Sequence, residues 1–263
     1  MTEQIKQIIE LILPVRTSWI QKGTDGLVRF VDPNDNEEIS AHYGATHAAA
    51  AFILWGKSTS NEVLYKQGLS LLHSILVRWD DNKKLTAFHS DFNNLAISMV
   101  EPIVDDKTAQ TIRNTICDTA DSNHYTINWL PMRWAVNKKR IEWKGDKNYQ
   151  STINKCKEII FKATNADGGI EDRLPHGTSF NLQYDLATVS ILQYLRVQGE
   201  PMDLSKELGF LLNAVAPDGD INYQGRGTNQ IFAWGLWIYL LASSGNTKDL
   251  LTALNFLEPR LKK

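Results

Sequence analysis

The feature that most constrains the fold is an internal repeat, in which a polar loop leads into an apolar helix and then into an amphipathic helix. The apolar segments begin at His42, Phe88, Tyr125, Ser179 and Gly227. They are apolar nearly all round, as expected for helices packed on most sides. The segments that follow are 61–79, 107–120, 149–164, 204–215 and 247–261. Their apolar residues recur every three or four positions opposite a charged face, which predicts outer helices packed on one side.

Five such pairs predict an all-α fold. We expect an α/α toroid, an incomplete barrel of about five inner–outer helix pairs, with an open helical solenoid as the alternative because repeat length does not determine whether a ring closes. No linker rich in Pro, Gly and Ser interrupts the chain, which predicts a single domain over 1–263. In a toroid the inner-helix starts gather on one face, so their polar residues should line one cleft.

Three Asp-Gly pairs precede or lie between the helix pairs: Asp25-Gly26, Asp167-Gly168 and Asp218-Gly219. Glycine after aspartate permits a positive φ, so each pair predicts a tight turn. The second and third pairs begin the segments DGGIEDRLPHG and DGDINYQGRG. Each of these segments is expected to form a small β-hairpin or an extended loop.

The charge balance excludes some classes of partner. Lys and Arg number 28 against 30 Asp and Glu, which leaves no electrostatic signature of nucleic-acid binding. No stretch approaches the roughly 18 apolar residues of a membrane span. The N-terminal apolar run is broken by Glu10 and ended by Pro14, so we expect no signal peptide and a cytoplasmic protein, although a removed leader would give the same sequence. Cys117 and Cys156 form no metal-binding motif, and no cofactor is expected.

The repeat, the loops with Asp-Gly followed by Tyr, and the His, Asn, Tyr and Arg residues at the inner-helix starts resemble the α/α-toroid carbohydrate-active enzymes. The resemblance is greatest to the heparinase-like and alginate-lyase-like polysaccharide lyases. It implies an enzyme that cleaves an acidic, uronic-acid-containing oligosaccharide or polysaccharide by β-elimination.

Elimination needs a base to remove the proton beside the sugar carboxylate and an acid to protonate the leaving oxygen. Tyrosine and histidine can fill both roles. The catalytic candidates at the inner-helix starts and in the last loop are Tyr223, Tyr184, His42, His47 and His89.

Elimination also needs a group that neutralises the sugar carboxylate. Asparagine and arginine can do this, and an exposed tryptophan can stack on a sugar ring. The substrate-binding candidates are Arg226, Arg133, Asn93, Asn94, Asn229, Asp185 and Trp129.

Two other functions fit the same pattern. A glycoside hydrolase of similar fold would use two carboxylates on either side of the scissile bond. Its candidates are Asp91, Asp185, Asp218 and Asp220. A toroid that binds a glycan or a protein without catalysis is the third possibility.

Overall fold

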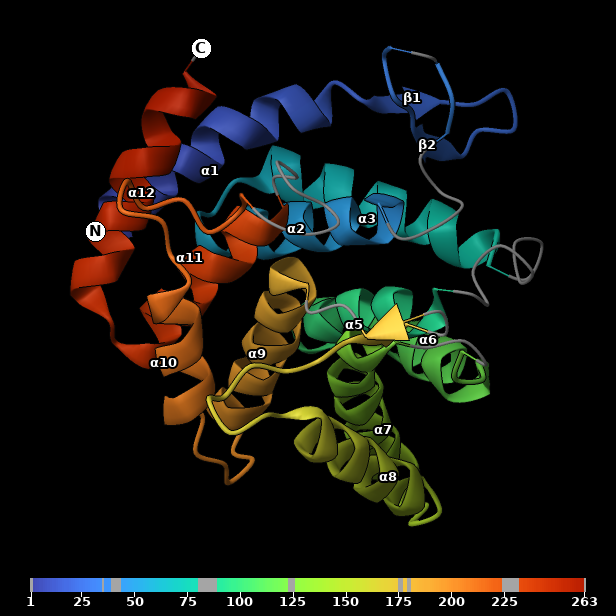
Figure 1. The fold of residues 1–263 in the computed structure, drawn as a ribbon. Coiled ribbons are helices and arrows are strands. Elements are labelled where there is room, and N and C mark those ends of the chain that lie inside the picture. Colours follow the sequence, from blue (N-terminus) through green and yellow to red (C-terminus); the bar gives the residue numbers. More distant parts are fainter. Residues whose placement is uncertain are drawn as a thin grey trace. The chain divides into compact units, whose positions relative to one another are not determined.

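The computed structural model describes residues 2–34, 36–38, 44–79, 89–122, 126–174, 177–178, 181–223 and 232–262. Helices dominate these residues (Figure 1). The α-helices are α1 (Thr2–Thr17), α2 (Gly44–Ser58), α3 (Glu62–Val77), α5 (Ser90–Val100), α6 (Asp106–Asp118), α7 (Leu130–Lys144), α8 (Tyr149–Ala163), α9 (Leu182–Val197), α10 (Ser205–Asn213), α11 (Phe232–Ser244) and α12 (Thr247–Leu261). The remaining elements are the 3-10 helices η1 (Glu101–Ile103) and η2 (Ile127–Trp129) and the strands β1 (Ile20–Lys22), β2 (Val28–Phe30), β3 (Arg173–Leu174) and β4 (Gly177–Thr178).

Each repeat predicted from the sequence contains an inner and an outer helix. In chain order the pairs are α2–α3, α5–α6, α7–α8, α9–α10 and α11–α12. Nine of the eleven residues of α5 are buried against three of thirteen in α6, and eleven of sixteen in α9 against two of nine in α10. In α11 only five of the thirteen residues are buried. The predicted alternation of helices is confirmed, and the contrast in burial is clearest at α5 and α9.

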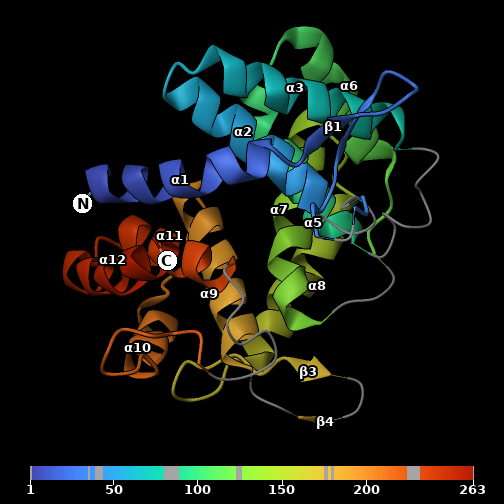
Figure 2. The same ribbon diagram turned by 90° about the horizontal axis from the view of Figure 1, so that it is seen from above.

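The chain forms two compact units. The first comprises Met1–Ile9, Tyr125–Ala135 and Ser151–Lys263. In this unit α9 packs against α10, α11 and η2, and α11 packs against α12, beside which it lies in Figures 1 and 2. Trp234 of α11 stacks on Phe256 of α12, with ring centroids 4.8 Å apart. An aromatic contact therefore joins this inner helix to its outer partner.

The second unit comprises Glu10–His124 and Val136–Gln150, and in it α2 packs against both α3 and α5. Helices α2 and α3 pack closely because each contributes a glycine to their contact. A Cβ atom on Gly68 would lie 2.8 Å from Cγ1 of Ile53, and one on Gly56 would lie 2.6 Å from the backbone nitrogen of Tyr65. A larger residue at either position would push the two helices apart, because packed interiors leave no room for an added methyl group.

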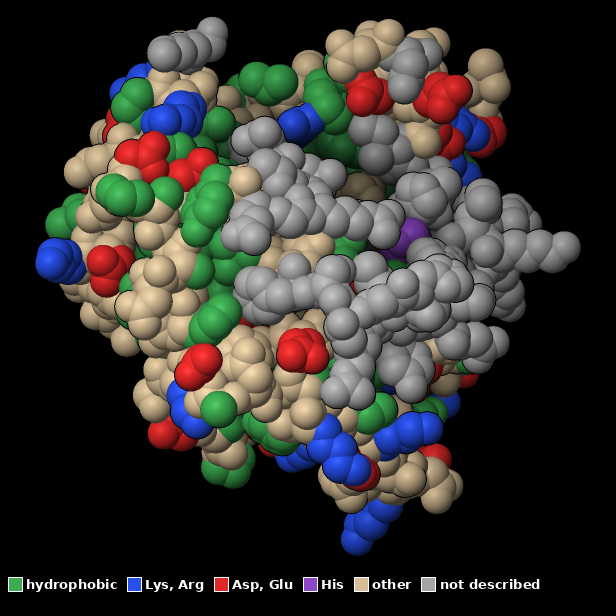
Figure 3. All heavy atoms as spheres, viewed as in Figure 1, with side chains coloured by type: hydrophobic (Ala, Val, Ile, Leu, Met, Phe, Trp, Pro, Cys, Tyr) green, Lys and Arg blue, Asp and Glu red, His purple; other side chains and the backbone are tan. Residues whose placement is uncertain are grey.

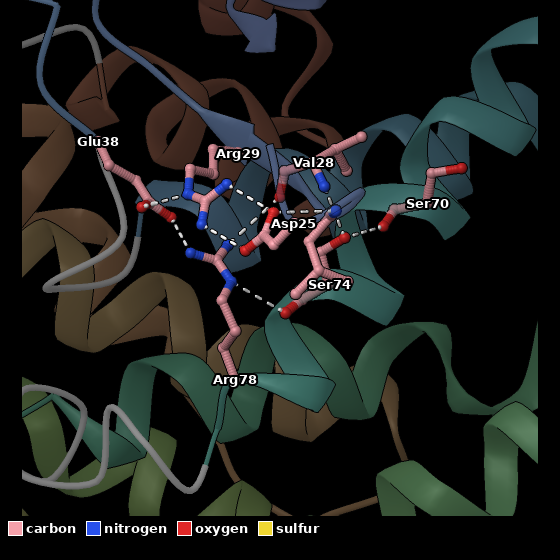
Figure 4. A network of polar contacts seen from close by, with 8 residues as sticks. Asp25, Val28, Arg29, Glu38, Ser70, Ser74 and Arg78 are labelled. Atoms are coloured by element: carbon pink, nitrogen blue, oxygen red, sulfur yellow. Dashed lines mark hydrogen bonds and ion pairs between the residues drawn. The ribbon is translucent and has the colours of Figure 1, made fainter. Parts of the chain in front are cut away.

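A network of polar contacts holds the β1–β2 hairpin to the C-terminal end of α3 (Figure 4). Arg29 binds Asp25 through two hydrogen bonds of 2.7 and 3.0 Å and lowers the pKa of that carboxyl to about 2. Glu38 joins two arginines, with Arg78 at 2.5 Å and Arg29 at 3.3 Å. The hydroxyl of Ser74 accepts a backbone N–H of β2 at 2.9 Å. The hairpin is therefore fixed to α3 through both side chains and backbone.

The three Asp-Gly pairs form the same turn. In each, the glycine N–H donates to the carbonyl three residues earlier, and the N–H of that earlier residue donates to the carbonyl just after the glycine. The glycines are Gly26, Gly168 and Gly219, with φ of 80°, 99° and 98°. A tight hairpin loop that ends in a left-handed glycine has this pattern. The turns predicted from the sequence are confirmed at all three places.

A short hairpin follows the second turn, as the sequence predicted. Strand β3 pairs antiparallel with β4, with Arg173 opposite Thr178 and Leu174 opposite Gly177 (Figure 2). In the loop after the third turn, residues 220–223 form no strand, and residues 224–231 lie outside the described residues.

Helix α1 continues through Pro14 to Thr17, beyond the point where the sequence predicted its apolar run to end. Proline has no backbone N–H, so the helix loses one hydrogen bond at Pro14. Because Pro14 is so near the end of α1, only about one turn of helix follows it. The hydroxyls of Thr17 and Ser18 donate to the carbonyls of Pro14 and Val15 at 2.9 and 2.7 Å. These two bonds satisfy acceptors that the end of a helix leaves free.

The substitution Gly168→Ala is expected to lower the free energy of unfolding more than Gly26→Ala does. Both glycines have a positive φ, which costs an alanine about 1–2 kcal/mol at either site. A Cβ at Gly168 would also lie 2.4 Å from the carbonyl oxygen of Lys206, whereas one at Gly26 meets nothing within 4 Å. The overlap adds roughly 1–3 kcal/mol. Urea unfolding of both variants measures the difference, and equal losses would show that the second turn does not pack on α10.

Candidate functional site

In the second unit, the starts of α2 and α5 meet through buried polar side chains. The hydroxyl of Thr46 donates to Oδ1 of Asn93 at 2.6 Å, and these residues are 4% and 1% exposed. Asp91, in the first turn of α5, is 0% exposed. Buried polar groups are costly unless they are hydrogen-bonded, so the Thr46–Asn93 contact stabilises a helix start that would otherwise be unfavourable.

Asn94 differs from its neighbour Asn93. It is 0% exposed, and neither Oδ1 nor Nδ2 has a hydrogen-bond partner among the described residues. The hydroxyl of Ser90, four residues earlier and so on the same side of α5, is also buried without a partner there. Asn94 was predicted to hold a substrate group, and its unused donor and acceptor are the chemistry such a role needs.

Two of the three candidate histidines lie in the described part of this unit. His89 precedes α5 and is half-buried, and its ring meets that of Phe92 edge to face with centroids 5.7 Å apart. His47 lies in α2 and is exposed. His42 lies outside the described residues.

In the first unit, the first turn of α9 buries a carboxyl group against the second Asp-Gly loop. Asp185 is 1% exposed, and its Oδ1 accepts the N–H of Ile170 at 3.3 Å. Burial raises the pKa of Asp185 to about 8; the Ile170 N–H opposes the rise and the charge of Glu207 adds to it. The carboxyl is therefore mostly protonated at neutral pH. Its Oδ2 is also buried and has no partner among the described residues.

A second buried carboxyl, Asp172, comes from the same loop and is 2% exposed. Its Oδ1 accepts the N–H of Ile127 in η2 at 2.5 Å, and its Oδ2 has no partner among the described residues. Burial raises the pKa of Asp172, but the N–H groups of Ile127 and Asn128 and the side chain of Thr126 oppose the rise because they favour the charged form. Burial therefore raises the pKa of both Asp172 and Asp185, and more hydrogen bonds oppose the rise at Asp172 than at Asp185.

The start of α9 also contacts the third Asp-Gly loop. Nε2 of Gln183 donates to the carbonyl of Ile221 at 3.1 Å. Asn181 caps the helix, because its Oδ1 accepts the N–H of Gln183 at 3.0 Å and that of Tyr184 at 3.4 Å. The candidate Tyr184 is half-buried in this turn, next to Asp185 in the chain. One helix start thus holds two of the repeated loops.

Tyr223, the first of the catalytic candidates, follows Ile221 in the third loop. Its ring is 46% exposed, and its hydroxyl donates to the carbonyl of Ala214, just after α10, at 2.5 Å. The hydroxyl therefore ties the loop to the preceding helix. The candidates Arg226 and Asn229 come next in the chain and lie outside the described residues.

Arg133 and Trp129 lie at the start of the third inner helix, within the first unit. Arg133 is 7% exposed in the first turn of α7, and Trp129 is half-buried in η2. Since η2 packs against α9, this helix start and the turn that carries Asp185 belong to one packed region. The structure thus places η2, which carries Trp129, in contact with α9, which carries Asp185.

Asp218, which is exposed, and Asp220, which is half-buried, have local roles in the third turn. Oδ1 of Asp218 accepts the N–H of Asp220 at 3.2 Å, and Oδ1 of Asp220 accepts the N–H of Asn222 at 2.7 Å. Side-chain bonds of this kind stabilise turns. Of the four hydrolase candidates, Asp91 and Asp185 are the buried ones.

Sequence reasoning missed Asp172 and Glu207. Asp172 is one of several charged residues in a loop, and nothing local indicates that it is buried. Glu207 lies on an outer helix whose charged residues were expected to face solvent, yet it is 7% exposed and its Oε2 has no partner among the described residues. The one signal in the sequence was that Glu207 lies in the first turn of its helix, where the helix dipole favours a carboxylate.

The described residues offer no sign of a metal site or a membrane span. No group of three His, Cys, Asp or Glu side chains lies together among them. No helix in the described part of the chain has the length and apolar character that a span requires. On the face drawn in Figure 3, described Lys and Arg side chains (blue) occur together with Asp and Glu side chains (red).

No protein-family model matches the sequence, and no curated protein matches it either. A solved structure does resemble this chain: the GH76A alpha-1,6-mannanase from Salegentibacter sp. HEL1_6. The TM-score is 0.66 and the identity 15%, over 95% of this chain and 84% of the mannanase.

At this identity the likeness shows the fold, which is the all-α, α/α-toroid fold predicted from the helix pairs. The toroid part of the predicted resemblance is therefore confirmed. The similar enzyme is a glycoside hydrolase, so the likeness lends no support to the lyase part or to an acidic substrate.

The substitution Asn94→Leu is expected to raise the free energy of unfolding by about 1–2 kcal/mol, because it removes a buried amide that has no partner among the described residues. The matched variant Asn93→Leu is expected to lower it, because it leaves the Thr46 hydroxyl without this acceptor. Thermal and urea unfolding measure both. A loss of stability in Asn94→Leu as large as in Asn93→Leu would mean that the Asn94 amide is satisfied in solution.

Proposed function

We propose that this protein is a glycoside hydrolase that acts on a neutral glycan. The observation that carries the proposal is Asp185, a carboxyl kept protonated by burial at an inner-helix start, with its Oδ2 unused among the described residues and a pKa of about 8. A protonated carboxylic acid near neutral pH is what a glycosidase needs to protonate the leaving oxygen. The fold shared with a mannanase supports the same reaction class.

In this proposal Asp185 is the general acid and Asp172 the second carboxylate. The Asp185 proton passes to the glycosidic oxygen as the bond between that oxygen and the anomeric carbon breaks. Asp172, at which two backbone N–H groups oppose the rise in pKa caused by burial, acts as a carboxylate on the anomeric carbon, directly or through a water molecule. Trp129 and Tyr184, from the same packed region, are proposed to contact the sugar.

The hydrolase is favoured over the lyase on charge and chemistry. A lyase must neutralise a uronic acid carboxylate, and the candidate Arg133 is only 7% exposed. The buried carboxyls of Asp172 and Asp185 would repel an anionic sugar when charged. A neutral substrate is compatible with them. Since the similar structure is that of an alpha-1,6-mannanase, α-1,6-linked mannose is the first substrate to test.

The test measures reducing ends released from α-1,6-mannan and from a panel of other neutral glycans. Asp185→Asn and Asp172→Asn are each expected to lower the rate by at least about 100-fold, the contribution of a general acid or base. The rate in the unsubstituted protein is expected to fall as the pH rises above about 8, because Asp185 must be protonated to act. Asp203→Asn is the control, since this exposed carboxyl accepts the N–H of Ser205 at 3.0 Å and belongs to no candidate site.

Other outcomes identify the competing functions. A rise in near-ultraviolet absorbance on a uronic acid polymer would identify a lyase and overturn the proposal. Binding of glycan without release of any product would identify a non-catalytic toroid. Retention of activity in Asp185→Asn would remove that residue from the mechanism.

A further inference from the structure

A hollow of about 530 Å³ lies between α6 and the C-terminal end of α7, within the second unit. Its lining residues are Glu101, Pro102, Gln110, Arg113, Glu142 and Trp143. The volume falls within the range of about 300–1,000 Å³ that is usual for small-molecule sites. Trp143 lies in the last turn of α7, whereas the candidate Arg133 lies in the first, so the hollow does not belong to the inner-helix starts.

The charges of this hollow are paired within the protein. Arg113 Nε donates to Glu101 at 2.6 Å, and Lys139 Nζ donates to Glu142 at 3.0 Å. Glu101 is 6% exposed, so its pair with Arg113 fixes the floor of the hollow. With each carboxylate matched by a cation, neither an anionic nor a cationic ligand gains a net attraction.

Several hydrogen-bonding groups remain unused beside these pairs. Among the described residues, Arg113 Nη1, Gln110 Oε1 and Glu142 Oε1 have no partner. They belong to residues that line the hollow, and they supply one donor and two acceptors. Such a set suits a ligand that carries several hydroxyl groups, each of which can donate and accept.

Trp143 gives the hollow its one large aromatic surface. The indole is half-buried, and Lys139 Nζ lies 6.0 Å from its ring centroid. An aromatic ring stacks on the C–H face of a pyranose, while charged and amide groups around it bind the hydroxyls. A purely apolar ligand would find only Trp143 and Pro102 to bury against.

We propose that this hollow is a binding site for a neutral saccharide, separate from the catalytic region. It stacks a pyranose ring on Trp143 and holds the hydroxyls with Gln110, Arg113 and Glu142. The site does not depend on the hydrolase proposal, because it would anchor a neutral glycan in a catalyst and in a non-catalytic toroid alike.

Affinity gel electrophoresis of the full chain tests this site, with α-1,6-mannan, laminarin and xylan as neutral probes and polygalacturonate as the acidic one. A neutral probe is expected to retard the unsubstituted protein. Trp143→Ala is expected to weaken that binding about tenfold, the loss of one good stacking contact. Trp143→Phe keeps an aromatic face and is expected to retain most of the affinity. Trp55→Ala is the matched control, a half-buried tryptophan of α2 that does not line the hollow.

A second variant guards against misfolding. Gln110 is exposed, so Gln110→Ala is expected to fold normally and still weaken binding severalfold. The proposal is overturned if no neutral probe retards the protein, if Trp143→Ala and Gln110→Ala bind as the unsubstituted protein does, or if polygalacturonate is the probe that depends on Trp143. Hydrolysis of a short oligosaccharide by Trp143→Ala at the normal rate separates this site from the catalytic region.

Discussion

The described part of the first unit depends on the hydrogen bonds between the Asp-Gly loops and the inner-helix starts. Asp185 accepts the N–H of Ile170, Gln183 donates to the carbonyl of Ile221, and Asp172 accepts the N–H of Ile127. Each bond satisfies a backbone group that would otherwise be buried without a partner. The glycines of these two turns approach the outer helices instead: Gly168 lies against Lys206 of α10, and Gly219 against Thr252 of α12.

In these contacts Asp172 and Asp185 each use only one of their two carboxyl oxygens. Each carboxyl uses one oxygen to hold backbone and keeps the other without a partner among the described residues. Burial raises the pKa of Asp185 to about 8 and also raises the pKa of Asp172, where backbone N–H groups oppose the rise. One residue can thus hold the loop in place and also supply a proton, so a structural contact and a catalytic role need not compete.

The helix pairs and the three turns were predictable because their signals are local: periodicity within a helix, and glycine after aspartate in a turn. The polar character of the inner-helix starts was predictable at Asn93, Asn94 and Asp185 for the same reason. The burial of Asp172 was not, because it depends on a backbone group 45 residues away in the chain. The choice of the proposed reaction class over the alternatives was also beyond the sequence, since residue types alone do not show which carboxyl is buried. The prediction that the N-terminal apolar run ends at Pro14 was wrong, because the effect of a proline on a helix depends on how near the helix end it lies.

The most direct test of this mechanism is the pKa of Asp185 itself, measured by following the 13C chemical shift of its carboxyl carbon across the pH range, with Asp185→Asn to assign the signal. A titration near pH 8 is expected, well above the value of about 3.9 for an exposed aspartate. A titration near pH 4 would show a solvated, charged carboxylate, and would contradict both the burial of this side chain and its proposed role as the acid.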